Sequence, residues 1–214
     1  MIIAKEQTSG HGRRGRKWLS PPGNIYGSFV VKKVLPPSQL TLIGALSALQ
    51  TLRDYAPALK FWVKWPNDVY VKSLKIAGVL SETHSPEKSN KTDGAIIGIG
   101  INLNTDRDFF EYGQVPGTSI FAETAKITCI DEFAKSLHDN LLKMYRETFI
   151  NPQGIYELWK RENILIGKEV QIIQESGHNL SGVFKDIDRD GSLVLLLPDG
   201  GTQNFHSGEI SVKH

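Results

Sequence analysis

The sequence of 214 residues contains a single cysteine, Cys129. One cysteine can form neither an internal disulfide nor a cysteine-built metal site. The sequence also lacks any apolar run of about 18 residues, the length that a membrane-spanning helix needs. Glu6 and a basic run precede any apolar stretch that would resemble a secretion signal. These absences predict a cytoplasmic protein with no membrane partner.

The common signatures of catalytic sites are missing as well. The six histidines show no metal-ligand spacing, and neither a Gly-x-Ser-x-Gly nor a Walker A sequence occurs. Gly10, Gly12 and Gly15 have the spacing of a dinucleotide-binding loop, but no strong strand precedes them and no helix obviously follows. None of these standard motifs therefore accounts for the glycines and histidines.

The net charge of +2 conceals an uneven distribution along the chain. Residues 1–20 contain five Lys or Arg residues and one Glu, a net charge of +4, so the remaining residues carry −2. Positive charge this local indicates one concentrated anion site rather than a broad nucleic-acid surface. A nucleic-acid binder stays as an alternative that depends on the basic segment alone.

Hydrophobic periodicity predicts alternating strands and helices in the first three quarters of the chain. β-branched and aromatic runs predict strands at residues 24–34, 61–71, 74–82 and 95–104. Apolar residues at helical spacing predict helices at residues 40–55, 131–148 and 152–162. A polar loop is expected at 85–94, and an irregular segment at 105–128. Pro66 predicts a bulge or a sheet edge.

After Gly167 the sequence consists of short strand-like runs separated by turn-rich segments. The runs lie at residues 168–173, 180–188, 191–197 and 202–212. This spacing predicts a small barrel or sandwich of about 50 residues. We therefore place a domain boundary near Ile164–Gly167, which gives one domain of residues 1–164 and a second of residues 165–214.

The segment SGHGRRGRKW, residues 9–18, combines four Arg or Lys side chains with three glycines. Glycines expose backbone N–H groups and allow a ligand to approach closely, and guanidinium groups match carboxylates and phosphates. The pattern is typical of a loop that wraps a small anionic ligand. A solvated basic turn is the alternative from composition alone, and Trp18 taken by itself is expected in the core.

The segment KWPND, residues 64–68, places polar side chains directly after a strand. Pro66 breaks the strand and directs Asn67 and Asp68 out of the ladder. An amide beside a carboxylate can hold a ribose, an adenine edge or a magnesium ion. The alternative is a simple Asn-Asp turn.

Two further polar residues lie in apolar strands. Lys75 stands in the run LKIAGV, where it either faces solvent or reaches into a pocket to bind an anion. Its neighbours Leu74 and Ile76 are expected to share the opposite, packed face. Asn102 ends the apolar run GIGIN, and a polar side chain there needs a partner, a metal or a substrate.

Four segments, in this order and rough spacing, resemble biotin protein ligases: GHGRRGRKW, KWPNDVYV, KIAGVLSE and GIGINLN. PGTSI, residues 116–120, is similar to a further segment of that family. The resemblance covers nearly the whole chain, and four ordered motifs are more specific than any one of them. It implies an α/β (α+β) fold: a mixed, largely antiparallel sheet with flanking helices, similar to class II aminoacyl-tRNA synthetase catalytic domains, and a small C-terminal SH3-like β-barrel.

The resemblance implies a two-step reaction that uses ATP and Mg²⁺. The carboxylate of biotin attacks the α-phosphate of ATP and releases pyrophosphate. A lysine of a biotin carboxyl carrier protein domain then attacks the resulting biotinyl-AMP. Carboxylate and phosphate repel each other on approach, so the arginine-rich loop would neutralise both. Neither step needs a protein nucleophile, in agreement with the missing nucleophile motifs.

The matching positions imply a role for each motif residue. By resemblance, the biotin contacts are Gln7, His11, Gly12, Arg13 and Lys75. The implied ATP contacts are Arg13, Arg16, Lys17, Trp18, Asn67, Asp68 and Asn102. Arg13 and Lys75 are the implied catalytic residues, and Asp68 and Asn102 are the implied Mg²⁺ ligands.

Two departures from the family pattern bear on this site. His11 stands where the family usually has arginine, which preserves a backbone contact but removes a guanidinium contact. An upstream Ser/Thr-Asn segment that binds biotin in the family is not found, so either the sequence begins inside the domain or the protein does without that wall. No helix-turn-helix precedes the first motif, so no DNA partner is expected; a homodimer is left open. The alternative functions are a lipoate–protein ligase and a non-catalytic biotin- or nucleotide-binding module.

Overall fold

The structure of the chain is a computed structural model that describes residues 1–32, 35–84, 94–113, 115–174, 179–206 and 208–212. The polar loop expected at 85–94 lies outside these residues, except for Gly94. Within the described residues, none of the helices has the length and apolar character needed to cross a bilayer.

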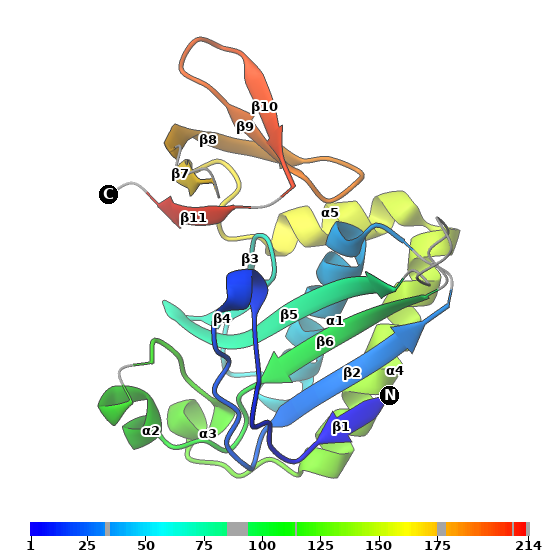
Figure 1. Cartoon of the computed structure of the whole chain (residues 1–214), viewed down its shortest axis with the longest axis vertical. Helices are drawn as coiled ribbons and strands as arrows, with labels where there is room; N and C mark the ends of the chain where they lie inside the picture. The colour runs from blue at the N-terminus through cyan, green and yellow to red at the C-terminus, as the bar shows by residue number, and fades with distance from the viewer. Residues whose placement is uncertain (33–34, 85–93, 114, 175–178, 207, 213–214) are drawn as a thin grey trace.

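A six-stranded sheet forms the centre of the larger part (Figure 1). Its spatial order is β1-β2-β6-β5-β4-β3, and every neighbouring pair of these strands is antiparallel. The strands are β1 (Ile2–Ala4), β2 (Ile25–Val31), β3 (Phe61–Lys64), β4 (Asp68–Val71), β5 (Leu74–His84) and β6 (Gly94–Ile101). The predicted largely antiparallel sheet with flanking helices is confirmed, and β6 has the central place that its apolar run favours.

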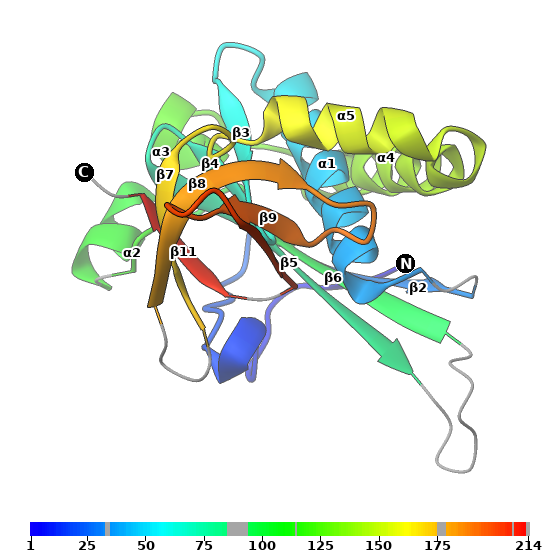
Figure 2. The ribbon, with the colours of Figure 1, turned by 90° about the horizontal axis from the view of Figure 1, so that it is seen from above.

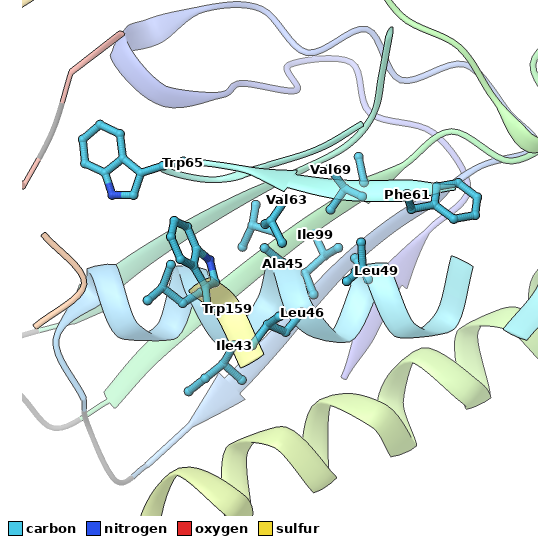
Figure 3. Close-up of a cluster of buried hydrophobic side chains, with 14 of the residues drawn as sticks. Ile43, Ala45, Leu46, Leu49, Phe61, Val63, Trp65, Val69, Ile99 and Trp159 are labelled. Atoms are coloured by element: carbon cyan, nitrogen blue, oxygen red, sulfur yellow. The ribbon is translucent and has the colours of Figure 1, made fainter. Parts of the chain in front are cut away.

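Helices cover one face of this sheet. Helix α1 (Pro37–Tyr55) packs on β5 and β6, and α4 (Ile130–Ile150) packs on α1 and reaches β2. A Cβ atom on Gly44 would lie 2.7 Å from Val79, so glycine allows the helix to approach the sheet closely. Figure 3 shows the resulting core, in which Leu46 and Leu49 of α1 lie beside Val63 and other apolar side chains. Burying each such side chain stabilises the fold by about 1.5–3 kcal/mol.

The C-terminal part is a five-stranded antiparallel sheet in the order β10-β9-β8-β7-β11 (Figure 2). Its strands are β7 (Glu169–Ile173), β8 (Asn179–Ile187), β9 (Leu193–Leu196), β10 (Thr202–Phe205) and β11 (Glu209–Val212). The single strand expected at 202–212 is wrong, because β10 pairs with β9 whereas β11 pairs with β7. Gly208 has φ +157° and lies between the two strands.

Two short helices interrupt the segment 105–128, so the expectation of an irregular segment is wrong. They are α2 (Arg107–Tyr112) and α3 (Ile120–Thr124). Asp106 accepts a hydrogen bond from the Phe109 N–H at 2.9 Å, and Ser119 accepts one from the Ala122 N–H at 2.9 Å. These side chains cap the helix N-termini, a local signal that outweighs the lack of a long apolar stripe.

The two sheets meet through α5 (Pro152–Glu162) and through direct contacts. The indole N–H of Trp65 donates to the Gly191 carbonyl at 3.1 Å, and Ser38 at the start of α1 donates to the Asp190 carbonyl. Buried side chains of both parts also belong to one continuous apolar cluster. The boundary near 164 falls between α5 and β7 and stays a prediction. These contacts hold the C-terminal sheet beside the face of the larger sheet that the helices do not cover.

Candidate functional site

A cavity of about 570 Å³ opens on the sheet face that the helices leave uncovered. Its walls come from the arginine-rich loop, from the β3–β4 turn, from β5 and β6, and from β11 of the C-terminal sheet. Figure 1 shows where these strands lie in the fold. Most residues that the resemblance singles out line it: Gln7, His11, Gly12, Arg13, Arg16, Lys17, Trp18, Asn67, Asp68 and Lys75. Gly98, Ile99 and Gly100 of GIGINLN line it too, so the structure brings all four sequence motifs into one site.

The arginine-rich loop forms a narrow hairpin with a 3₁₀ turn at Arg13–Gly15. The Gly12 N–H donates to the Arg16 carbonyl at 2.7 Å, and the Trp18 N–H donates to the Gly10 carbonyl at 2.9 Å. Arg14 and Gly15 have φ values of +58° and +67°. Glycine adopts such values without the steric cost that a side chain pays. Three arginines of this loop, Arg13, Arg14 and Arg16, line the cavity.

Trp18 lies on a floor made of glycine backbone. A Cβ atom added to Gly100 would lie 2.8 Å from the indole, and one added to Gly78 would lie 3.2 Å from it. Gly78 and Gly100 are direct cross-strand neighbours on β5 and β6. Among the described residues, the buried Trp18 Nε1 has no hydrogen-bond partner. Trp18 is thus a wall of the cavity rather than a member of the core, contrary to the expectation from its residue type alone.

Lys75 projects into the cavity and forms an ion pair with Asp68, with 2.6 Å between Nζ and Oδ1. A β-bulge produces this orientation, because Tyr70 pairs with Lys75 whereas Val69 pairs with Ala77. Ile76 is buried but Leu74 is 37% exposed. The expectation that Leu74 and Ile76 share one packed face is therefore wrong, since the additional residue shifts the alternation of side chains.

Asn67 fastens the β3–β4 turn to the neighbouring strand. Its side-chain amide donates to the Val79 carbonyl at 3.0 Å, and its own carbonyl accepts from the Val79 N–H at 2.9 Å. Its Oδ1 accepts a hydrogen bond from Arg13 Nη1 at 3.5 Å. Pro66 lies in this turn beside the edge strand β3, so the expected sheet edge is present, whereas the bulge lies between β4 and β5. Asn67 thereby links the turn to the arginine-rich loop.

Asn102 is the one predicted site residue that does not line the cavity. Its side-chain amide donates to the Thr118 carbonyl at 3.0 Å, and the Thr118 N–H donates to the Lys75 carbonyl at 2.9 Å. The need for a polar partner, which the sequence predicts, is thus met by backbone. In this structure Asn102 anchors the segment PGTSI beside Lys75, and a direct ATP or Mg²⁺ contact stays a prediction.

Other residues for which the sequence predicted no role also line the cavity, among them Lys64, Tyr70 and Glu209. The pKa of Lys64 is lowered overall, mainly by burial. Nearby Asp68 opposes this shift, whereas Lys75 adds to it. The Lys64 ammonium lies 5.1 Å from the centroid of the Tyr70 ring. Burial, helped by Asp68, raises the pKa of Tyr70 to about 12. Strand alternation from Asp68 could have suggested Tyr70, whereas no local signal marks Glu209.

The donor groups of the cavity fit a nucleotide-bound magnesium ion rather than a dedicated metal site. Among the described residues, no group of three or more His, Cys, Asp or Glu side chains is arranged to hold a metal. Magnesium usually takes one or two carboxylates and completes its shell with water and substrate phosphates. Asp68 supplies one such carboxylate in the cavity. The chemistry of the site is therefore cationic binding of anions, with Asp68 as the carboxylate beside Lys75.

Known proteins resemble both parts of the chain. Residues 1–102 match the Biotin/lipoate A/B protein ligase family, and residues 165–213 match the Biotin protein ligase C terminal domain. The chain is 31% identical over 208 residues to a biotin–[acetyl-CoA-carboxylase] ligase of Paracoccus denitrificans, with 93% of this chain and 85% of that protein covered. It is 30% identical over 222 residues to the bifunctional ligase/repressor BirA of Escherichia coli, with 99% of this chain but 65% of that protein covered.

A solved structure agrees with these relatives. The biotin protein ligase from Aquifex aeolicus in complex with biotin and ATP superposes with a TM-score of 0.84 at 28% identity, with 99% of this chain and 87% of that chain covered. The similarity therefore extends over both sheets, including the strands that form the cavity.

Proposed function

Since this chain belongs to the biotin protein ligase family, we propose that it activates biotin with ATP and transfers the biotinyl group to a lysine of a biotin carboxyl carrier protein domain. The observation that carries the proposal is the cavity that Arg13, Arg16 and Lys75 line together with Trp18, whose indole lies on the glycine backbone of β5 and β6. Cations are needed where a carboxylate meets a phosphate, and the indole of Trp18 offers a flat apolar surface to a ligand.

The residues divide the proposed reaction between them. Lys75 and Arg13 neutralise the biotin carboxylate and the α-phosphate. As negative charge develops on the phosphoryl oxygens, the contacts of both cations with these oxygens become stronger. Arg16, Lys17 and Trp18 hold the nucleotide. Asp68 would hold the Mg²⁺ that accompanies ATP, and the ion would supply additional positive charge at the phosphates.

Biotin is assigned to the end of the cavity where the loop begins. Gln7, His11 and Gly12 line that end, and the Gln7 side chain is fixed because its Oε1 accepts a hydrogen bond from Ser20 Oγ at 2.7 Å. The imidazole of His11 is exposed, so backbone contacts at His11 and Gly12 account for its place in the motif better than a side-chain contact. Asn102 helps to hold the Lys75 backbone in place. Its amide donates to the Thr118 carbonyl, and the Thr118 N–H donates to the Lys75 carbonyl.

Two alternatives lose support from the relatives. The matched family model covers both biotin and lipoate ligases, but the relatives at about 30% identity are named for biotin. A non-catalytic binding module loses support because these relatives are named as ligases. We further propose that the protein works in the cytoplasm. Its macromolecular partner is the carrier domain rather than DNA, because the positive charge is concentrated at one cavity rather than spread over a broad surface. A homodimer is proposed as its assembly, which sedimentation velocity would test.

Transfer of biotin tests the function. The intact protein, biotin, ATP and Mg²⁺ are incubated with a carrier domain, and its mass is measured. One biotinyl group should appear on the acceptor lysine, and an excess of lipoate should not compete. Unmodified carrier would contradict the proposal, and a lipoyl product would support the lipoate alternative instead.

A further inference from the structure

A buried carboxylate in the short helix α3 joins two segments that flank Lys75. Glu123 accepts a hydrogen bond from Thr118 Oγ1 at 2.8 Å and forms an ion pair with Lys72 Nζ at 2.6 Å. The Glu123 side chain is 4% exposed, and a charge this deeply buried is retained in proteins only when it is paired. Burial alone would raise the pKa of Glu123, but the hydrogen bonds from Lys72 and Thr118 and the charge of Arg107 lower it overall.

Lys72 lies at the tip of the hairpin that leads into Lys75. Val71 pairs directly with Leu74, so a two-residue turn joins β4 to β5. Lys72 has φ +53°, a left-handed value that glycine adopts freely and that a residue with a side chain adopts only under strain. Such a conformation persists where surrounding contacts hold it, and the ion pair with Glu123 is a contact of this kind.

Thr118 contacts the strand on the other side of Lys75. Its N–H donates to the Lys75 carbonyl at 2.9 Å, and its hydroxyl is the group that donates to Glu123. Val115 and Pro116, shortly before it in the sequence, line the cavity. The same carboxylate therefore holds the hairpin that carries Lys75 and the segment that forms the adjoining wall.

We propose that Glu123 is a positioning residue for adenylation, which holds Lys75 and the wall of Val115–Pro116 at the separation in which the reactants meet. Glu123 is not among the described residues that line the cavity, so it acts through Lys72 and Thr118 rather than on the reactants. Rate depends steeply on such a separation, because a displacement of about 1 Å costs about a hundredfold. The inference deepens the proposed function and rests on it, since Lys75 is assigned there to the reacting carboxylate and phosphate.

A purely structural role of Glu123 predicts a different result. Loss of the buried ion pair would then lower the melting temperature and the fraction of active protein, whereas each active molecule would react at the normal rate. A positioning role lowers the rate in molecules that are folded and bind their substrates. The first round of biotinyl-AMP formation separates the two, because its amplitude counts the active molecules and its rate constant reports adenylation.

The test follows this first round by rapid quench, with biotin, ATP and Mg²⁺ in excess over the intact protein and no carrier present. Glu123→Gln should lower the rate constant between about tenfold and a hundredfold. The amplitude should stay near that of the wild type, and the affinity for biotin should fall by a smaller factor than the rate, because the cation is needed most where charge develops. Glu111→Gln, an exposed glutamate on α2, is the matched control and should react at the wild-type rate.

Three further variants test the contacts through which Glu123 acts. Thr118→Val removes the hydroxyl at nearly constant shape and should slow adenylation severalfold, and Thr118→Ser should be faster than Thr118→Val. The double variant Glu123→Gln/Thr118→Val should be scarcely slower than Glu123→Gln, since both changes break one contact. Lys72→Met acts at an exposed position, should also slow adenylation, and keeps the proposal testable if Glu123→Gln does not fold.

The outcomes distinguish this inference from the proposed function. An unchanged rate constant in Glu123→Gln, or a loss confined to the amplitude or the melting temperature, would overturn the positioning role while the function stands. Equal rates in Thr118→Val and Thr118→Ser, or effects that multiply in the double variant, would overturn it as well. A wild-type protein that forms no biotinyl-AMP would contradict the proposed function, and the inference with it.

Discussion

The ammonium group of Lys75 lies 2.6 Å from Asp68 Oδ1 and 5.1 Å from the centroid of the Trp18 ring. One side chain thus joins the β3–β4 turn to the arginine-rich loop. Asp68 already neutralises this cation, and its side chain is 20% exposed. A substrate carboxylate must therefore compete with Asp68 for Lys75, or Asp68 must turn toward Mg²⁺ as the nucleotide binds.

Replacing Lys75 with alanine should impair adenylation far more than stability. Loss of the charge that meets the developing negative charge should cost about a hundredfold or more in rate. The partly exposed ion pair should contribute only about 1 kcal/mol to the free energy of unfolding. Biotin-dependent pyrophosphate release and a thermal melt measure the two effects.

Two further variants show whether the loss of pyrophosphate release is specific to the Lys75 ammonium group. Lys75→Arg should remain impaired, because a planar fork does not replace a compact ammonium in a closed pocket. Lys60→Ala, an exposed lysine at the end of the turn before β3, should release pyrophosphate normally. Normal rates in Lys75→Ala would remove this residue from the mechanism.

Gly100→Ala should displace Trp18 from the glycine floor. The added Cβ would lie 2.8 Å from the indole, and overpacking of this kind costs about 1–3 kcal/mol. Because the displaced indole would no longer contact the nucleotide, we expect the affinity for ATP to fall about tenfold, which corresponds to about 1.4 kcal/mol of binding free energy. In Gly94→Ala on the same strand the new Cβ has its nearest neighbour at 3.6 Å, so its affinity should not change. Equal ATP affinity in both variants would show that Trp18 does not contact the nucleotide.

Ligands should protect the arginine-rich loop from proteolysis. Arg16 and Lys17 are exposed and the Arg14 side chain is partly exposed. These cations repel one another, and Glu209 is a shared counter-charge for Arg14 and Arg16. Biotin and ATP add negative charge and should hold the loop closed over the reactive anhydride, excluding water. Trypsin cleavage within Arg13–Lys17 should slow severalfold with both ligands present. An unchanged cleavage rate would contradict loop closure.

Stability should depend on pH through Glu162. Burial alone would raise its pKa, but hydrogen bonds from Arg53 and Arg161 lower it overall. A carboxyl whose pKa is lower in the folded state contributes stability above its unfolded pKa of about 4.5 and loses it as the pH falls through the folded value. Glu162→Gln should therefore cost about 1.5–3 kcal/mol at pH 7, and the difference should shrink toward pH 3.

Thermal melts between pH 3 and pH 7 measure this dependence. Glu157→Gln on the same helix is the control, because Glu157 is exposed and 3.6 Å from Lys160. A constant difference between wild type and Glu162→Gln across the range would show that the charge of Glu162 does not contribute.

Features with a strong local pattern were predictable from the sequence. The apolar run of β6 and the helical stripe of α4 each dictate one element, because burying those side chains outweighs other preferences. β1 has three residues and forms only by pairing with β2, so no local pattern marks it. The caps Asp106 and Ser119 were visible as residue types, but they start helices too short for a periodic signal.

The parts of the cavity that a single sequence segment forms were predictable from the sequence. The glycines and arginines of residues 9–18 indicate an anion site without any tertiary information. The orientation of Lys75 depends on a bulge opposite β4, which residue spacing within β5 does not reveal. Glu209 reaches the loop only because two sheets pack together, so its contribution is a property of the tertiary fold.

Biotin-dependent exchange of labelled pyrophosphate into ATP tests the central claim most directly, because it isolates adenylation in this cavity from the carrier domain. With the intact protein and Mg²⁺, label should enter ATP when biotin is present and should not do so without biotin or with lipoate in its place. Lys75→Ala should lower the exchange about a hundredfold. Absence of exchange in a folded wild-type protein that is supplied with biotin, ATP and Mg²⁺ would contradict the account.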